Sequence, residues 1–215
     1  MDKWRNAWYT GGMKRLIFLT AVLALAYIGL ISCGSTKNVA AADSSRAKLN
    51  PVYVTDKAQF NLLPTTAVEK NFDAVQHFKA TFGEKEFESD VLLIADSEKL
   101  VMTILNNFGA TMGELNYNND LVVFNSDLFP KALKAEYIVA DVQFCLYRVD
   151  ALAKAMEDIG LKLVVSIADK IDGNSVETRS IFEGEKEIAH IEKSIGKITY
   201  TNFLREYSYT LQGTF

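Results

Sequence analysis

The order in which two kinds of apolar pattern occur along the chain most constrains its fold. Between residues 72 and 125, apolar and polar side chains alternate or short apolar runs stand between turn residues, and both patterns are typical of β-strands. After Pro130 apolar residues recur at helical spacing, and from Leu161 onward the strand-like patterns return. Because short links between strands imply antiparallel pairing, the sequence predicts an α+β domain whose antiparallel sheet is interrupted by helices.

The strand predictions differ in how many faces they bury. In Phe72–Phe82 the apolar residues share one parity except at Gln76, which predicts a strand with one face in water. Val91–Ala95 is apolar throughout, so we expect both of its faces to be covered. The other predicted strands are Leu100–Leu105, a hairpin of Glu114–Tyr117 and Leu121–Asn125, Leu161–Ile167, a hairpin of Thr178–Glu183 and Glu187–Ile191, and a long final strand over Ile198–Leu211.

Two helices are predicted between the strands. Lys131–Tyr147 and Asp150–Gly160 each place apolar residues on one stripe, and Gly160 is a natural helix stop. The end of the first segment, Val142–Tyr147, is also compatible with a strand. Because the helices come after about half of the strands, they can fold back across the concave apolar face of the sheet. That placement would explain why Val91–Ala95 is apolar on both sides.

A short apolar run near the amino terminus predicts an export signal. The positive pair Lys14-Arg15 precedes the apolar stretch Leu16–Leu30, and Leu30-Ile31-Ser32-Cys33-Gly34 follows the pattern of a bacterial lipobox. We therefore expect cleavage before Cys33 and lipidation of its thiol. An uncleaved anchor stays open as an alternative, because the run is only just long enough to span a bilayer, and so does an ordinary secreted protein.

The sequence predicts three parts in the chain. Residues 1–32 form the signal peptide, with Met13 an alternative start. Residues 33–65 carry the lipidated cysteine and a flexible tether, because the stretch from Gly34 to about Asn50 is too polar to bury enough surface. Residues 66–215 form the folded domain. Gly34 after the cysteine, where aspartate would retain the protein, indicates export to the outer membrane, facing the periplasm.

Charge and cysteine content exclude several classes of partner. Loss of residues 1–32 would change the formal net charge from −4 to about −7. An acidic chain without a cluster of Lys and Arg is a poor binder of nucleic acid and of anionic lipid surfaces, so the anchor must supply the membrane contact. Cys145 is the only other cysteine, which leaves no intramolecular disulfide, and its apolar setting is typical of a small core residue.

The sequence offers little that supports an enzyme or a cofactor site. His77 and His190 have no Cys, Asp or Glu at metal-ligand spacing, and neither a Gly-x-Ser-x-Gly elbow nor a phosphate-binding Gly-rich loop occurs. Carboxylates gather around the second hairpin at Glu183, Glu185, Glu187 and Glu192, where interleaved lysines favour a solvated edge. We therefore expect a non-catalytic protein without metal or cofactor.

Two segments carry a resemblance to a known family. Ile104–Leu115 occupies the place where LolB-type proteins carry a strand, a Gly-Pro-Leu-Gly-like turn and a further strand, and Tyr200–Leu211 resembles their closing strand. The chain thus resembles a family of bacterial lipoproteins of unknown function related to LolA and LolB. The resemblance implies an antiparallel half-open β-barrel with helices over its concave face and an apolar cavity for acyl chains. It also implies a lipid or polyene cargo, because relatives are often encoded with aryl-polyene clusters.

The expected function is binding or transfer of a hydrophobic ligand, which would be an acyl chain, a lipoprotein or an aryl-polyene lipid. A cavity of this kind needs apolar side chains and no catalytic residues, and each candidate could equally be ordinary core. The alternative is a structural or assembly lipoprotein with a filled core that acts through an envelope protein partner. Candidate lining residues are Phe82, Leu93, Met102, Ile104, Met112, Val122, Val139 and Val142.

Overall fold

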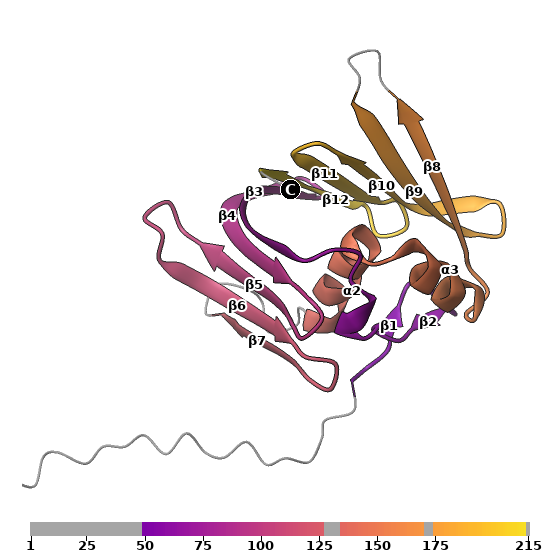
Figure 1. Ribbon diagram of the computed structural model, residues 1–215, viewed down its shortest axis with the longest axis horizontal. Coiled ribbons are helices and arrows are strands. Elements are labelled where there is room, and N and C mark those ends of the chain that lie inside the picture. Colours follow the sequence, from indigo (N-terminus) through magenta and orange to yellow (C-terminus); the bar gives the residue numbers. More distant parts are fainter. Residues whose placement is uncertain (1–48, 127–133, 170–173, 214–215) are drawn as a thin grey trace, which may run out of the picture. The chain divides into compact units, whose positions relative to one another are not determined.

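The computed structural model describes residues 49–126, 134–169 and 174–213 (Figure 1). Most of the described chain is β-strand, with two α-helices between the seventh and eighth strands. The elements in chain order are β1 (Val52–Tyr53), β2 (Gln59–Phe60), the 3-10 helix η1 (Thr65–Ala67), β3 (Phe72–Phe82), β4 (Lys85–Ala95), β5 (Leu100–Leu105), β6 (Thr111–Tyr117), β7 (Val122–Ser126), α2 (Ala135–Leu146), α3 (Val149–Glu157), β8 (Lys162–Asp169), β9 (Ser175–Glu183), β10 (Lys186–Ser194), β11 (Lys197–Asn202) and β12 (Tyr207–Gly213).

Ten of the strands form one antiparallel sheet. Its order is β7-β6-β5-β4-β3-β12-β11-β10-β9-β8, so two runs of hairpins meet where β3 pairs with β12. In the part of the chain that is described, β7 and β8 each pair along one side only, and the sheet is open. The helices connect these two edge strands, and Figure 1 shows α2 lying between the two halves of the bent sheet. The predicted α+β class with one antiparallel sheet is confirmed.

Several sequence predictions match the observed elements closely. The predicted strand Phe72–Phe82 has the bounds of β3, and both predicted hairpins form, as β6–β7 and β9–β10. Val91–Ala95 is the buried end of β4, where alternate residues from Val91 are buried and those between them are half-buried. The helical stop at Gly160 is also confirmed, because this residue has a φ of 78° and follows α3.

The prediction of one long final strand over Ile198–Leu211 is wrong. The segment forms two antiparallel strands, β11 and β12, joined by a turn at residues 203–206. No Gly or Pro marks this turn. Asn202 stabilises it instead, because its side-chain Oδ1 accepts the backbone N–H of Arg205 at 2.9 Å, and Glu206 adopts a φ of 55°. The apolar residues change from even to odd positions between Tyr200 and Tyr207, so a break in the alternation marked this turn in the sequence.

The folded part begins earlier than the residue 66 that the sequence indicated. Val52, Val54 and Phe60, in and beside β1 and β2, are buried in the main core. The Phe60 ring lies 5.1 Å from the ring of Phe144 in α2, in an edge-on arrangement that favours aromatic pairs. Part of the predicted tether therefore packs as a small hairpin against α2. The polar residues around these positions hid the even spacing of the apolar residues in the sequence.

A buried arginine fixes the end of α2. Arg179 of β9 is fully buried, and its Nη1 donates to the carbonyls of Phe144 and Tyr147 at 3.1 and 2.7 Å. Its Nε donates to Glu177 at 2.6 Å and its Nη2 to Glu69 at 2.9 Å. The last carbonyls of a helix have no partner within the helix, so Arg179 satisfies them and ties α2 to the sheet. None of the described helices is long and apolar enough to cross a membrane.

A candidate apolar pocket with a charged rim

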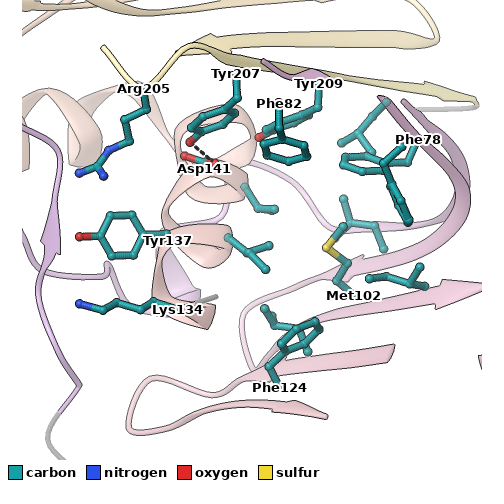
Figure 2. A pocket seen from close by; sticks show the side chains of 17 residues that line it. Phe78, Phe82, Met102, Phe124, Lys134, Tyr137, Asp141, Arg205, Tyr207 and Tyr209 are labelled. Atoms are coloured by element: carbon teal, nitrogen blue, oxygen red, sulfur yellow. Dashed lines mark hydrogen bonds between the residues drawn. The ribbon is translucent and has the colours of Figure 1, made fainter. Parts of the chain in front are cut away.

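A pocket of about 440 Å³ lies between the concave face of the sheet and α2 (Figure 2). One wall is made by strands from both halves of the sheet and the other by α2. The lining residues are Phe78, Phe82, Phe87, Leu93, Met102, Ile104, Leu115, Phe124, Lys134, Tyr137, Ile138, Asp141, Val142, Arg205, Tyr207, Tyr209 and Leu211. Apolar side chains dominate this set, as in sites that bind organic ligands.

Strand register explains why the apolar wall is continuous. Leu93 pairs with Met102, Met102 with Leu115 and Leu115 with Phe124, so one row of side chains crosses β4, β5, β6 and β7 on the same face. The row is built by side chains that are neighbours across the sheet but distant in sequence. This row supplies the aliphatic part of the pocket wall and the ring of Phe124.

Aromatic rings make the other part of the wall. Phe78 of β3 contacts Phe87 of β4 edge-on, with ring centroids 6.0 Å apart. The ring centroid of Tyr209 in β12 lies 5.7 Å from that of Phe78. Phe82 and Tyr207 are stacked at 5.7 Å across the β3–β12 pair. This pair is the join between the two halves of the sheet, so the pocket depends on both halves.

Asp141 is the one carboxylate among the described residues that line the pocket. It lies on α2 between the apolar residues Ile138 and Val142, and its Oδ2 accepts the hydroxyl of Tyr207 at 2.7 Å (Figure 2). Asn202 donates through its side-chain amide to Tyr207 at 3.4 Å. The carboxylate is thus oriented by groups from α2, β11 and β12.

Burial shifts the acidity of the groups around Asp141. Desolvation raises the pKa of Asp141 to about 7, and it outweighs hydrogen bonds from Tyr207 and Tyr200 and the charge of Arg205, which act in the opposite direction. The same burial raises the pKa of Tyr207 well above its usual range and that of the Cys145 thiol to about 12. Near neutral pH Asp141 therefore exchanges between its neutral and charged forms, while the phenols and the thiol stay neutral.

Two cations and an aromatic ring form the rim of the pocket. The guanidinium carbon of Arg205 lies 5.0 Å from the centroid of the Tyr137 ring, and the ammonium of Lys134 lies 6.0 Å from the same centroid. Both distances are within the range of cation–π contacts. Arg205 also donates to the backbone carbonyl of Tyr53. In Figure 2 Arg205, Tyr137 and Lys134 follow one another along one side of the pocket, away from Phe78 and Met102.

The structure brings five of the eight candidate lining residues into the pocket. These are Phe82, Leu93, Met102, Ile104 and Val142. Val139 is fully buried in the core, because on α2 the positions that face the pocket are 137, 138, 141 and 142. Met112 and Val122 are half-buried in β6 and β7, where Leu115 and Phe124 line the pocket instead.

Sequence reasoning did not identify the polar residues of the pocket. Asp141 carried a usable signal, because it interrupts an apolar helical stripe. Arg205 and Lys134 carried none, since each stands in a charged or turn-like stretch, and only folding brings both of them to the ring of Tyr137.

The other chemical candidates lie away from the pocket, and Cys33 lies outside the described residues. His77 is half-exposed on β3, 3.0 Å from Glu88 and 3.1 Å from Asp90. His190 contacts Glu187 at 2.8 Å and Glu192 at 3.7 Å. Across residues 49–126, 134–169 and 174–213, no group of three or more His, Cys, Asp or Glu is placed to hold a metal ion.

Comparison with known proteins gives a match at the level of a family. A family model described as "Protein of unknown function (DUF3261)" matches residues 73–213. Every residue that lines the pocket falls within this range. No curated protein matches the chain.

Proposed function

The chain belongs to the family described as Protein of unknown function (DUF3261), and we propose that it binds a hydrophobic, acyl-chain-like ligand in the pocket between the sheet and α2. The observation that carries this proposal is an apolar wall facing open space. Side chains such as Phe78, Phe124 and Ile138 would normally be fully covered by other protein atoms, and here they are only partly buried and line a pocket of about 440 Å³.

The size of the pocket supports an organic ligand. Pockets for small molecules typically enclose about 300–1,000 Å³, whereas a cavity of about 150 Å³ already holds benzene. A chain of ten methylenes buried there would contribute up to about 8 kcal/mol before the costs of binding. No nucleophile or base is needed to retain such a ligand, which supports binding or transfer rather than catalysis.

The export signal supports a location for this activity. We infer that the protein is cleaved before Cys33, lipidated there and held at the outer membrane facing the periplasm. The resemblance to proteins related to LolA and LolB supports a half-open barrel as the finer description of the bent sheet and a lipid, lipoprotein or aryl-polyene cargo. Replacement of Cys33 by serine should abolish incorporation of labelled palmitate and release the protein from the membrane fraction.

Ligand extraction and a pocket-filling variant test the binding itself. Purified full-chain protein should carry a co-purifying apolar species in native mass spectrometry, and it should bind an apolar fluorescent probe. Met102→Trp adds bulk inside the pocket and should weaken probe binding at least tenfold. Val75→Trp is the matched control, because Val75 lies half-exposed on β3 and does not line the pocket.

A different outcome would favour a structural role. If the protein shows a clean unliganded mass and no probe binding, the ligand-binding proposal is wrong. The remaining explanation would then be a lipoprotein that acts through a protein partner, and cross-linking in cells would be the next measurement.

A further inference from the structure

The charged groups at the pocket have a specific arrangement. Lys134 and Arg205 both line the pocket at its rim, and both lie over the Tyr137 ring, 6.0 and 5.0 Å from its centroid. Figure 2 shows them on the side of the pocket away from Phe78 and Met102. A ligand with its chain against the apolar wall would therefore place its polar end near the two cations.

The two rim cations differ in their partners from the buried Arg179. Within the described residues, neither Lys134 nor Arg205 has a carboxylate oxygen within 4.0 Å. The buried Arg179 contrasts with them, because Glu177 and Glu69 both pair with it. Two cations over an apolar pocket without such partners are a local excess of positive charge on an otherwise acidic chain.

Asp141 does not cancel this excess. Its carboxyl group already accepts a hydrogen bond from Tyr207, and its burial favours the neutral acid. It forms no ion pair within 4.0 Å with any described residue. The charge at the pocket therefore stays positive at neutral pH.

From this arrangement we propose that the ligand is a single-chain amphiphile with an anionic head group, a carboxylate or a phosphate, that Lys134 and Arg205 bind at the rim. The inference rests on the proposed function, because it names the ligand class of the same pocket. Guanidinium presents a planar fork of donors that matches both kinds of anion, and the ammonium of Lys134 adds a mobile point charge. The aromatic wall takes the chain.

A panel of ligands with one chain and different head groups tests this inference. Dodecanoate, dodecyl phosphate, dodecan-1-ol and dodecyltrimethylammonium are titrated below their micelle-forming concentrations against full-chain protein loaded with an apolar fluorescent probe. We expect the two anions to displace the probe at about tenfold lower concentration than the alcohol, which corresponds to about 1.4 kcal/mol. The trimethylammonium ligand should be the weakest of the four.

Variants of the rim link the preference to the two cations. Lys134→Gln and Arg205→Gln should each lower the affinity for dodecanoate by a larger factor than the affinity for dodecan-1-ol, so that the two affinities approach each other. Lys154→Gln removes a charge from the exposed face of α3 and should change nothing. Because Arg205 also contacts Tyr53, Arg205→Lys keeps the charge and should retain most of the preference even where Arg205→Gln destabilises the fold.

The outcomes separate the head-group inference from the proposed function. Equal affinity for the alcohol and the anions overturns the inference and leaves an apolar ligand in place. Tightest binding of trimethylammonium also overturns it, because Asp141 would then be the recognition group. Failure of all four ligands and of the probe contradicts the proposed function itself. Tighter binding of dodecanoate or of dodecyl phosphate supports the inference and distinguishes a fatty acid from a phospholipid-like source.

Discussion

Two arginines of the domain, Arg179 and Arg205, have opposite surroundings. Arg179 is fully buried, and all of its nitrogens donate to helix carbonyls or carboxylates. Arg205 is exposed beside the pocket, and it contacts one carbonyl and the face of Tyr137. The first has no capacity left for a ligand, whereas the second retains donors and charge. The comparison shows that hydrogen-bond saturation, and not residue type, separates a structural cation from a candidate binding group.

The positive charge of Arg179 is balanced by the carboxylates of Glu69 and Glu177. Lys193 joins it, with its ammonium 3.0 Å from Glu69 and 3.1 Å from Glu177. Burial alone would raise the pKa of Glu177, but hydrogen bonds and charge from Arg179 and Lys193 outweigh it and lower the pKa. At the pocket the reverse holds, because burial outweighs the partners of Asp141 and raises its pKa.

The largest expected effect on stability comes from removing Arg179, whose nitrogens all donate hydrogen bonds. Arg179→Leu leaves the carbonyls at the end of α2 without their donor and leaves Glu177 and Glu69 with Lys193 alone of their two paired cations. We therefore expect a loss of about 3–5 kcal/mol in the free energy of unfolding. Urea denaturation measures it. Arg148→Leu is the matched control, because Arg148 is exposed and pairs with Asp150 at 3.3 Å, and it should cost less than about 1 kcal/mol. Equal losses in the free energy of unfolding for both variants would mean that the buried Arg179 stabilises the fold no more than the exposed Arg148.

The second prediction concerns opposite dependences on pH. Asp141 has a pKa of about 7 in the folded chain against a reference value of 3.8, so the folded state holds a proton that the unfolded state loses. Its contribution to stability therefore falls as pH rises from about 4 to about 7, by up to about 4 kcal/mol, and is constant above that. Glu177 has a lowered pKa, so its contribution is lost as pH falls through the folded-state value.

Asp141→Asn isolates the first of these dependences. The amide keeps an acceptor for Tyr207 and cannot ionise, so the variant should be more stable than the parent at pH 8 and nearly equal to it at pH 4. Unfolding curves across this range measure the difference. A parent and variant whose stabilities run parallel over the whole range would show that Asp141 does not titrate in the pocket.

The third prediction tests the hydrogen bond that orients Asp141. Tyr207→Phe keeps the ring that stacks on Phe82 and removes the hydroxyl that donates to the carboxylate. We expect a loss of about 1.5–3 kcal/mol at pH 8, where Asp141 is charged, and a smaller loss at pH 5. Tyr53→Phe removes an exposed hydroxyl that accepts from Gln59, and it should have little effect at either pH.

The accuracy of sequence reasoning differs between the sheet and the pocket. Alternation located β3 to the residue and found both hairpins, because side-chain period and turn composition are local properties. The pairing of β3 with β12, which joins the two halves and carries Phe82 against Tyr207, is set by packing over more than a hundred residues. No local pattern encodes it.

The candidate site shows the same division. Apolar residues such as Leu93 and Met102 could be proposed as lining because they lie on strands that something must cover. Whether a covered residue meets a void or a neighbour depends on where α2 lies, which Arg179 fixes from β9. The rim depends on that placement too, since Lys134 and Tyr137 come from the α2 region and Arg205 from the turn before β12.

The smallest expected effect is on stability at the rim. Lys134 makes a cation–π contact at 6.0 Å and no ion pair among the described residues, so Lys134→Gln should change the free energy of unfolding by less than about 0.5 kcal/mol. Thermal and urea unfolding measure this directly, with Lys154→Gln as the control for loss of one exposed charge. A stability loss close to that of Arg179→Leu would mean that Lys134 supports the fold. Its position at the pocket would then be a consequence of packing, and the anionic ligand would lose one of its two binding groups.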